Sequence, residues 1–205
     1  MAKPASRFAG AELASRAVRL FLAGLVPDSV KQTLQAQLEP VRAATPQARW
    51  LPPESLHLTL LFLGSVAEET VSPLREAFGG VCGHHRALSL TLAGMETFGP
   101  TRSPRVLATT LSGEVEALQA LVADARRAAE QLVPLEPERP FRPHLTVARA
   151  RSAQGDRLLG RCRSALAQGL QGTFILRDVA LFESHTRSTG AVHTEVQRWT
   201  LAAHA

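Results

Sequence analysis

The chain contains no tyrosine, only two cysteines and only two lysines among its 205 residues. Cys82 and Cys162 are far apart and follow no metal-ligand spacing, which favours two reduced thiols over a disulfide or a metal site. No apolar run approaches the ~18 residues that a membrane span needs. The apolar stretch 17–26 is interrupted by Arg19, which argues against a secretory signal. These absences exclude a disulfide-rich secreted domain and a membrane protein, and they favour a cytoplasmic location.

The composition is that of an ordinary globular protein. Hydrophobic residues make up 45% of the chain and charged residues 20%, which is enough apolar material for a sizeable core. A length of 205 residues suits one domain or two closely packed lobes. We therefore expect a flexible N-terminal tail over residues 1–16, which are Ala-rich and mildly basic, followed by one domain or two closely packed lobes over residues 17–205. We also expect a monomeric protein.

Positive charge is concentrated in one part of the chain. The net charge is +5, and the segment from Arg139 to Arg163 holds seven arginines with Asp156 as its one acidic residue. Because the planar guanidinium of arginine can grip a phosphate with two hydrogen bonds, this cluster predicts a phosphate-bearing partner. The structural alternative for the same arginines is a solvated helix face.

The hydrophobic periodicity predicts an α+β protein with mostly antiparallel strands. The expected strands span residues 19–24, 56–63, 87–92, 105–111, 143–148, 173–182 and 192–201. The expected helices begin at residues 27–29 and end near Pro40, cover residues 71–81, follow Ser112, and cover residues 156–167. No low-complexity segment or solenoid repeat is present.

Two of the expected strands carry the same motif, His-x-Thr-x, at positions 87 residues apart. His57 and Thr59 share one face of their strand, as do His144 and Thr146, because residues i and i+2 of a strand point the same way. The alternate positions are apolar and are expected to pack under helices: Leu56, Leu58, Leu60, Phe62, Leu145 and Val147. A buried polar pair in an apolar strand is costly by itself, so the two strands are predicted to lie side by side and to line one groove.

Such a groove would hold two imidazoles and two hydroxyls around a small anion. Opening a cyclic phosphodiester requires a base that activates water and an acid that protonates the departing oxygen. An ordinary histidine pKa near ~6.5 allows one neutral and one protonated ring near neutral pH. Thr59 and Thr146 can donate hydrogen bonds to phosphate oxygens, and Arg149, with Arg142, can stabilise the charge that builds on the phosphoryl group. A single histidine in a strand is more often structural, but two copies of His-x-Thr favour the catalytic interpretation.

On these stretches the chain resembles the 2H phosphoesterases, and among them the RNA 2′,3′-cyclic phosphodiesterases that are also called 2′-5′ RNA ligases. The resemblance rests on residues 19–23, 55–64 and 139–149, with a weaker match from Leu181 to Trp199. The most specific of these motifs is Pro-Phe-x-Pro-His-x-Thr-x-x-Arg at residues 140–149. In order and spacing the likeness covers nearly all of residues 17–201.

The resemblance implies a fold and a mechanism. The implied fold is two-lobed, with two mostly antiparallel sheets lining a central cleft, helices outside and a pseudo-twofold axis. The implied chemistry uses no metal, no cofactor and no covalent intermediate, with His57 as the proton donor and His144 as the proton acceptor. The implied product is a 2′-phosphomonoester of RNA, and some family members also join RNA ends through a 2′-5′ linkage without ATP.

One position departs from the family pattern, and two aromatic residues are candidates for contacting a nucleobase. Where the family usually has a tyrosine in its last strand, this chain has His193, so the substrate contact made there is open. Phe21 and Phe141 could stack on a base, although core packing is the alternative for both. His84 and His85 lie at the end of an expected helix and are expected to be solvated, and His185, His193 and His204 show no zinc-ligand spacing.

Two other functions are compatible with these residues. One is a phosphodiesterase acting on small cyclic nucleotides, and the other is a non-catalytic module that binds nucleotides or RNA. The intact motifs argue against the second. No Gly-rich phosphate loop is present, which argues against a ligase that consumes ATP.

Overall fold

The computed structural model describes residues 16–137, 139–187 and 190–203. The helices are α1 (Asp28–Ala44), α2 (Val71–Gly83), α3 (Val115–Glu130) and α4 (Arg157–Ala165), with short 3₁₀ turns η1 (Pro53–Ser55) and η2 (Glu68–Thr70). The strands are β1 (Ala17–Leu25), β2 (Arg49–Trp50), β3 (His57–Ala67), β4 (Leu88–Phe98), β5 (Val106–Gly113), β6 (His144–Arg149), β7 (Thr173–Leu176), β8 (Asp178–Arg187) and β9 (Gly190–Thr200). The predicted α+β class is confirmed. The predicted tail falls on residues 1–15, outside the described residues, and on Arg16.

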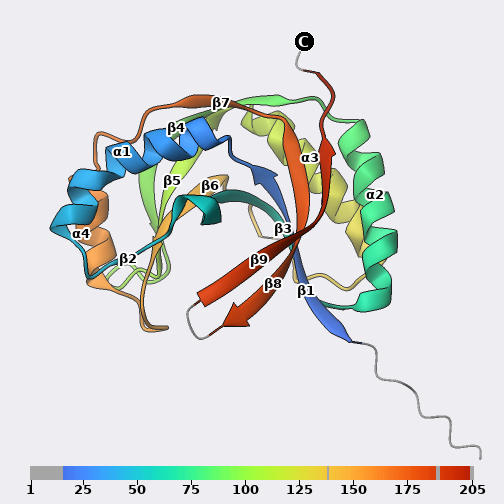
Figure 1. Ribbon diagram of the computed structural model, residues 1–205, viewed down its shortest axis with the longest axis horizontal. Coiled ribbons are helices and arrows are strands. Elements are labelled where there is room, and N and C mark those ends of the chain that lie inside the picture. Colours follow the sequence, from blue (N-terminus) through green and yellow to red (C-terminus); the bar gives the residue numbers. More distant parts are fainter. Residues whose placement is uncertain (1–15, 138, 188–189, 204–205) are drawn as a thin grey trace, which may run out of the picture.

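The described strands form one curled sheet in the order β7-β4-β5-β6-β3-β1-β8-β9, with β2 paired to β6 (Figure 1). All of these named pairs are antiparallel. The two motif strands, β3 and β6, are neighbours at the centre of the order, and they pair at the position Leu58–Leu145. The two expected sheets are therefore two halves of one sheet, joined at the motif strands.

The order of elements repeats along the chain. The run β1-α1-β3-α2 in the first half matches β5-α3-β6-α4 in the second, and the motif strand is the second strand of each run once the short β2 is set aside. The helices lie outside the curl in two pairs, α1 with α4 on the left of Figure 1 and α2 with α3 on the right. This repetition about the β3–β6 junction fits the expected pseudo-twofold arrangement.

Helix α1 buries the face that its periodicity predicts, namely Val30, Leu34 and Leu38. The predicted end near Pro40 is wrong, because the helix continues to Ala44 with Pro40 inside it. A proline in a helix interior removes one backbone hydrogen bond. Val41 of the last turn packs against the hydrophobic core, and this contact supplies tertiary support that the local sequence rule does not include.

The predicted strand over residues 173–182 is wrong as a single element. The chain leaves the sheet at Arg177, so that β7 pairs with β4 in one half while β8 pairs with β1 and β9 in the other. The curl brings the two halves close at this crossing: a Cβ on Gly24 of β1 would lie 2.8 Å from a methyl carbon of Leu176, at the end of β7. Both strands are buried on the same core, and the polar residues Arg177 and Asp178 between their apolar runs mark the crossover.

Candidate active site

The junction of β3 and β6 brings all four motif side chains into one cleft of about 520 Å³. Leu58 pairs with Leu145, and extending this antiparallel register by one residue in each direction places His57 across from Thr146 and Thr59 across from His144. The residues that line the cleft are Arg19, Leu20, Phe21, Arg49, Leu51, Ser55, His57, Thr59, Phe62, His144, Thr146, Arg149, Ser184, Ala191 and His193. The predicted grouping of the two motifs around one cavity is thus what the structure contains.

The two motif imidazoles are oriented by the same backbone contact. Nδ1 of His57 lies 2.8 Å from the carbonyl oxygen of Ser55, and Nδ1 of His144 lies 2.7 Å from the carbonyl oxygen of Arg142. A carbonyl oxygen only accepts hydrogen bonds, so each Nδ1–H donates and the neutral ring carries its proton on that nitrogen. Nε2 of each ring is left available to exchange a proton with a ligand.

The surroundings of His57 lower its pKa. The pKa of His57 is lowered from 6.5 to about 4, chiefly by burial and in part by the nearby His193, Arg149 and His144, while the hydrogen bond to Ser55 acts in the opposite direction. His57 is therefore neutral at neutral pH in the free protein. An anion placed beside this imidazole would offset the nearby positive charge and favour its protonated form.

Arg149 faces a second arginine that the sequence pattern does not indicate. Strand β2 pairs Arg49 with Arg149, and both side chains line the cleft. Although Arg149 reaches solvent, the surrounding protein partly dehydrates its guanidinium and lowers its pKa, and the like charge of Arg49 adds to this effect. Two adjacent guanidinium groups favour an anion between them. A two-residue strand has no periodicity that could have revealed Arg49.

Phe21 forms the floor beneath His57. Only 3% of its surface is exposed, its ring stacks on Phe182 at a centroid distance of 5.3 Å, and it lies 5.1 Å from the ring of His57. These contacts support the packing alternative, since little of its ring remains for a base. His193 closes the same side, with its ring edge-on to His57 at 5.4 Å. Its Nδ1 is buried and has no hydrogen-bond partner within the described part of the chain, and burial lowers its pKa.

Two predicted substrate contacts are not brought into the cleft. Arg142 forms an ion pair with Glu96 and lies over the ring of Phe98, 5.0 Å from its centroid. Phe141 packs against the hydrophobic core. Neither side chain belongs to the cleft lining, because both precede β6 and are engaged by residues distant in sequence. Arg142 contributes through its backbone carbonyl, which orients His144.

Phe62, in contrast, lines the cleft although the sequence pattern predicts that it packs under a helix. The alternation of β3 places it under a helix, and this prediction is wrong: 65% of its surface is exposed and its ring belongs to the cleft lining.

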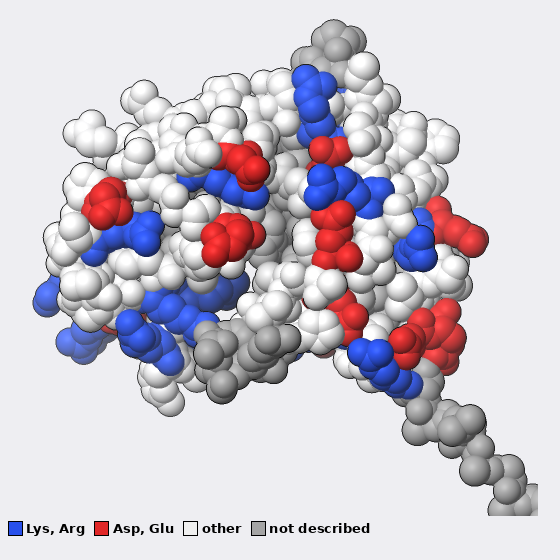
Figure 2. Space-filling view, in the orientation of Figure 1, with Lys and Arg blue, Asp and Glu red and all other residues white. Residues whose placement is uncertain are grey.

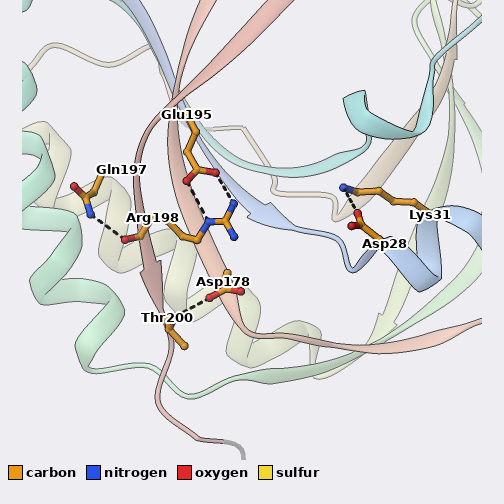
Figure 3. Close-up of polar contacts among 7 residues, drawn as sticks. All are labelled: Asp28, Lys31, Asp178, Glu195, Gln197, Arg198 and Thr200. Atoms are coloured by element: carbon orange, nitrogen blue, oxygen red, sulfur yellow. Dashed lines mark hydrogen bonds and ion pairs between the residues drawn. The ribbon is translucent and has the colours of Figure 1, made fainter.

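A second cavity of about 740 Å³ adjoins the motif cleft and shares Phe21, His57 and His193 with it. Several charged side chains at its edge are paired with one another (Figure 3). Arg198 binds Glu195, Lys31 binds Asp28, and Asp178 accepts a hydrogen bond from Thr200. This larger cavity contains neither threonine of the motifs nor His144, so the candidate reaction site is the smaller cleft.

Basic side chains also gather outside the cleft. Figure 2 shows Lys and Arg side chains concentrated at its lower left, around the position of α4 and β2 in Figure 1. Arg151, Arg157, Arg161 and Arg163 are exposed. Within residues 16–137, 139–187 and 190–203, no cluster of His, Cys, Asp and Glu is arranged to hold a metal ion. Among the helices of this part, none combines the length and apolarity needed to cross a membrane.

Comparison with known proteins gives consistent results. Residues 25–108 and 111–193 match the model of the LigT-like phosphoesterases. An RNA 2′,3′-cyclic phosphodiesterase of Thermus thermophilus is 31% identical over 199 residues, covering 90% of each chain. A protein of the same name from Geobacillus stearothermophilus is 34% identical over 129 residues, which are 63% of this chain but only 41% of that protein.

Solved structures agree with this match. The structure of TT0787 of Thermus thermophilus has a TM-score of 0.72 at 25% identity, covering 91% of this chain and 100% of that one. E. coli LigT complexed with ATP has a TM-score of 0.68 at 24% identity, covering 91% and 99%, a likeness that concerns the fold alone.

Proposed function

Because the chain belongs to the LigT-like phosphoesterase family, we propose that it hydrolyses RNA 2′,3′-cyclic phosphodiester ends to 2′-phosphomonoesters, with His57 and His144 as the acid–base pair. The observation that carries the proposal is the convergence of the two His-x-Thr pairs in one cleft, each imidazole held by a backbone carbonyl. The names of the relatives from Thermus and Geobacillus support the reaction class.

The proposed reaction is a single displacement at phosphorus. Nε2 of His144 takes a proton from a water molecule, whose oxygen attacks the phosphorus. The bond from phosphorus to the ribose 3′ oxygen breaks, and Nε2 of His57 supplies the proton that this oxygen needs, which leaves the phosphate on the 2′ oxygen. The hydroxyls of Thr59 and Thr146 and the guanidinium of Arg149 bind the non-bridging oxygens as their negative charge grows.

The lowered pKa of His57 sets a condition on its role as the donor. At neutral pH the free protein carries a neutral His57, since burial holds its pKa at about 4. The cyclic phosphodiester brings a negative charge next to the imidazole and raises the pKa there. His57 thus takes up its proton together with the substrate, which couples protonation of the acid to binding of the anion it serves.

The proposal includes ligation as a side activity of the same site. If the 5′ hydroxyl of a second RNA replaces water, the same displacement joins the two ends through a 2′-5′ phosphodiester, and no ATP is consumed. The proposal also includes the bilobal domain over residues 17–205, the monomeric state and the cytoplasmic location, all of which stay predictions.

The test is a short RNA that ends in a 2′,3′-cyclic phosphate, with the product phosphate mapped to the 2′ or 3′ oxygen. We expect a 2′-phosphate, formed at the same rate in the presence of excess EDTA. A 3′-phosphate product would contradict the assigned bond cleavage, and turnover restored by a divalent ion after chelation would contradict the two-histidine chemistry. Binding without any product would favour a non-catalytic module.

A further inference from the structure

Two cavities adjoin the motif cleft, and they differ in charge. The larger one, of about 740 Å³, shares Phe21, His57 and His193 with the cleft, and a smaller one, of about 400 Å³, shares Arg49 with it. The RNA that precedes a terminal cyclic phosphate continues beyond the cleft. Because every phosphodiester of that RNA carries a negative charge, the charges that line the two cavities determine which of them suits it.

The larger cavity has no excess of positive charge. Its lining contains four carboxylic acids, compared with three lysine and arginine side chains. Two of these cations are already paired with carboxylates, Arg198 with Glu195 and Lys31 with Asp28 (Figure 3). A phosphate that entered this cavity would meet carboxylates and compete with them for the same cations, so the larger cavity is unfavourable for the RNA backbone.

The smaller cavity is lined by three arginines and by one acidic residue, Glu39. The arginines are Arg42 in the last turn of α1, Arg49 of β2, and Arg151, which follows β6. Nε of Arg151 donates a hydrogen bond to the carbonyl oxygen of Gln47 at 2.8 Å, which orients the guanidinium. Among the described residues, neither Arg42 nor Arg151 has a carboxylate as an ion-pair partner. Guanidinium groups gathered in this way favour a phosphate ligand.

Arg49 connects this cavity to the reacting groups. It pairs with Arg149, and the Cα atoms of such antiparallel partners lie about 4.5–5.5 Å apart. Because Arg149 is assigned to the reacting phosphate, the smaller cavity offers a second anion position close beside the first. We propose that Arg42, Arg49 and Arg151 form a subsite for the phosphodiester that joins the terminal nucleotide to the nucleotide before it. The proposal rests on the proposed function and names the subsite that distinguishes an RNA end from a mononucleotide.

The experiment compares adenosine 2′,3′-cyclic phosphate with its 5′-phosphorylated form, which adds the charged group that the subsite would bind. In the wild type, KM should be lower for the 5′-phosphorylated substrate. The double variant Arg42→Gln/Arg151→Gln should raise that KM about 4- to 25-fold, from about 2- to 5-fold for each exposed charge pair. KM and kcat for the substrate without the 5′-phosphate should keep their wild-type values. Arg75→Gln/Arg127→Gln removes the same charge from the exposed surface of α2 and α3 and is the matched control.

A variant of the acidic residue should act in the opposite direction. Glu39→Gln should lower KM for the 5′-phosphorylated substrate about 2-fold, because it removes the one carboxylate of this lining. Equal wild-type KM values for the two substrates, or equal changes on both in the Arg42/Arg151 variant, would overturn the proposal. A rise in KM confined to Lys31→Gln/Arg198→Gln would place the 5′-phosphate in the larger cavity instead. Each of these results leaves the proposed function intact, whereas a wild type that hydrolyses neither substrate, nor an RNA with a cyclic end, would remove it.

Discussion

His57 and His144 occupy matching places at the centre of the sheet, but their surroundings differ. Both rings donate from Nδ1 to the carbonyl of the residue two positions earlier, and both face a threonine across the junction. His57 is enclosed by Phe21 and His193, whereas His144 lies against the ring of Phe98, at 4.6 Å. The comparison shows that the repeated motif sets the geometry of the two imidazoles, while the protein packed around His57 lowers the pKa of that ring.

The largest expected effect tests whether the two strands are equivalent in importance. His57→Ala and His144→Ala should each lower turnover about 10²- to 10⁴-fold, the usual contribution of a positioned acid or base. The double variant should be little worse than either single one, because groups that act together are not additive. Single-turnover hydrolysis of a cyclic-phosphate RNA measures this. His85→Ala is the control, since that ring binds Asp124 outside the cleft. Near-normal turnover of either motif variant would remove the two-histidine mechanism.

The next effect separates the arginine inside the cleft from the one that the structure places outside it. Arg149→Gln should reduce turnover about 10²- to 10³-fold, as expected for loss of a group that stabilises transition-state charge. Arg142→Gln should leave turnover close to wild type, because its guanidinium is engaged by Glu96 and its backbone carbonyl, which orients His144, is retained. Comparable losses in the two variants would mean that Arg142 reaches the substrate after all.

A third prediction concerns the burial of His57 and its effect on the free energy of unfolding. The pKa of His57 is 6.5 in the unfolded chain and about 4 in the folded protein, so between these values the unfolded chain binds more protons. The stability contributed by the neutral ring is present above pH 6.5 and is lost as the pH falls toward about 4. This contribution to the free energy of unfolding is at most about 3 kcal/mol.

Denaturant unfolding of wild type and His57→Gln between pH 7.5 and pH 4 measures this loss. As the pH is lowered from 7.5 to 4, the free energy of unfolding should fall less steeply in His57→Gln than in the wild type. Thr59→Val, which removes no titrating group from the same strand, should follow the wild-type curve. Parallel curves for wild type and His57→Gln would show that burial does not suppress protonation of His57.

The smallest effect concerns the basic surface around α4 compared with the opposite side of the molecule. If Arg157 and Arg161 follow the RNA backbone, replacing both with Gln should make the log–log salt dependence of oligonucleotide binding shallower by ~0.7 for each phosphate that is no longer bound. Turnover of a mononucleoside cyclic phosphate should be unchanged. Replacing the exposed Arg75 and Arg127 of α2 and α3 is the matched control. An unchanged slope in the Arg157/Arg161 variant would assign the α4 arginines to a solvated surface.

The sequence alone was sufficient for features that depend on local periodicity. His57 and Thr59 share a face, as do His144 and Thr146, because a strand alternates its side chains, and α1 buries Val30, Leu34 and Leu38 because a helix repeats every 3.6 residues. These periods are properties of the backbone and need no knowledge of distant residues.

Tertiary structure decided the rest. The pairing of β3 with β1 leaves Leu60 as an extra residue of β3, and this bulge reverses the direction of Phe62. Arg49 meets Arg149 only because β2 pairs with β6, and Arg142 turns away because Glu96, on another strand, attracts it. Register and ion-pair partners depend on segments far apart in the chain, and so does the burial that lowers the pKa of His57. Local sequence therefore specified which residues could do the chemistry, whereas packing specified which of them meet and in what charge state.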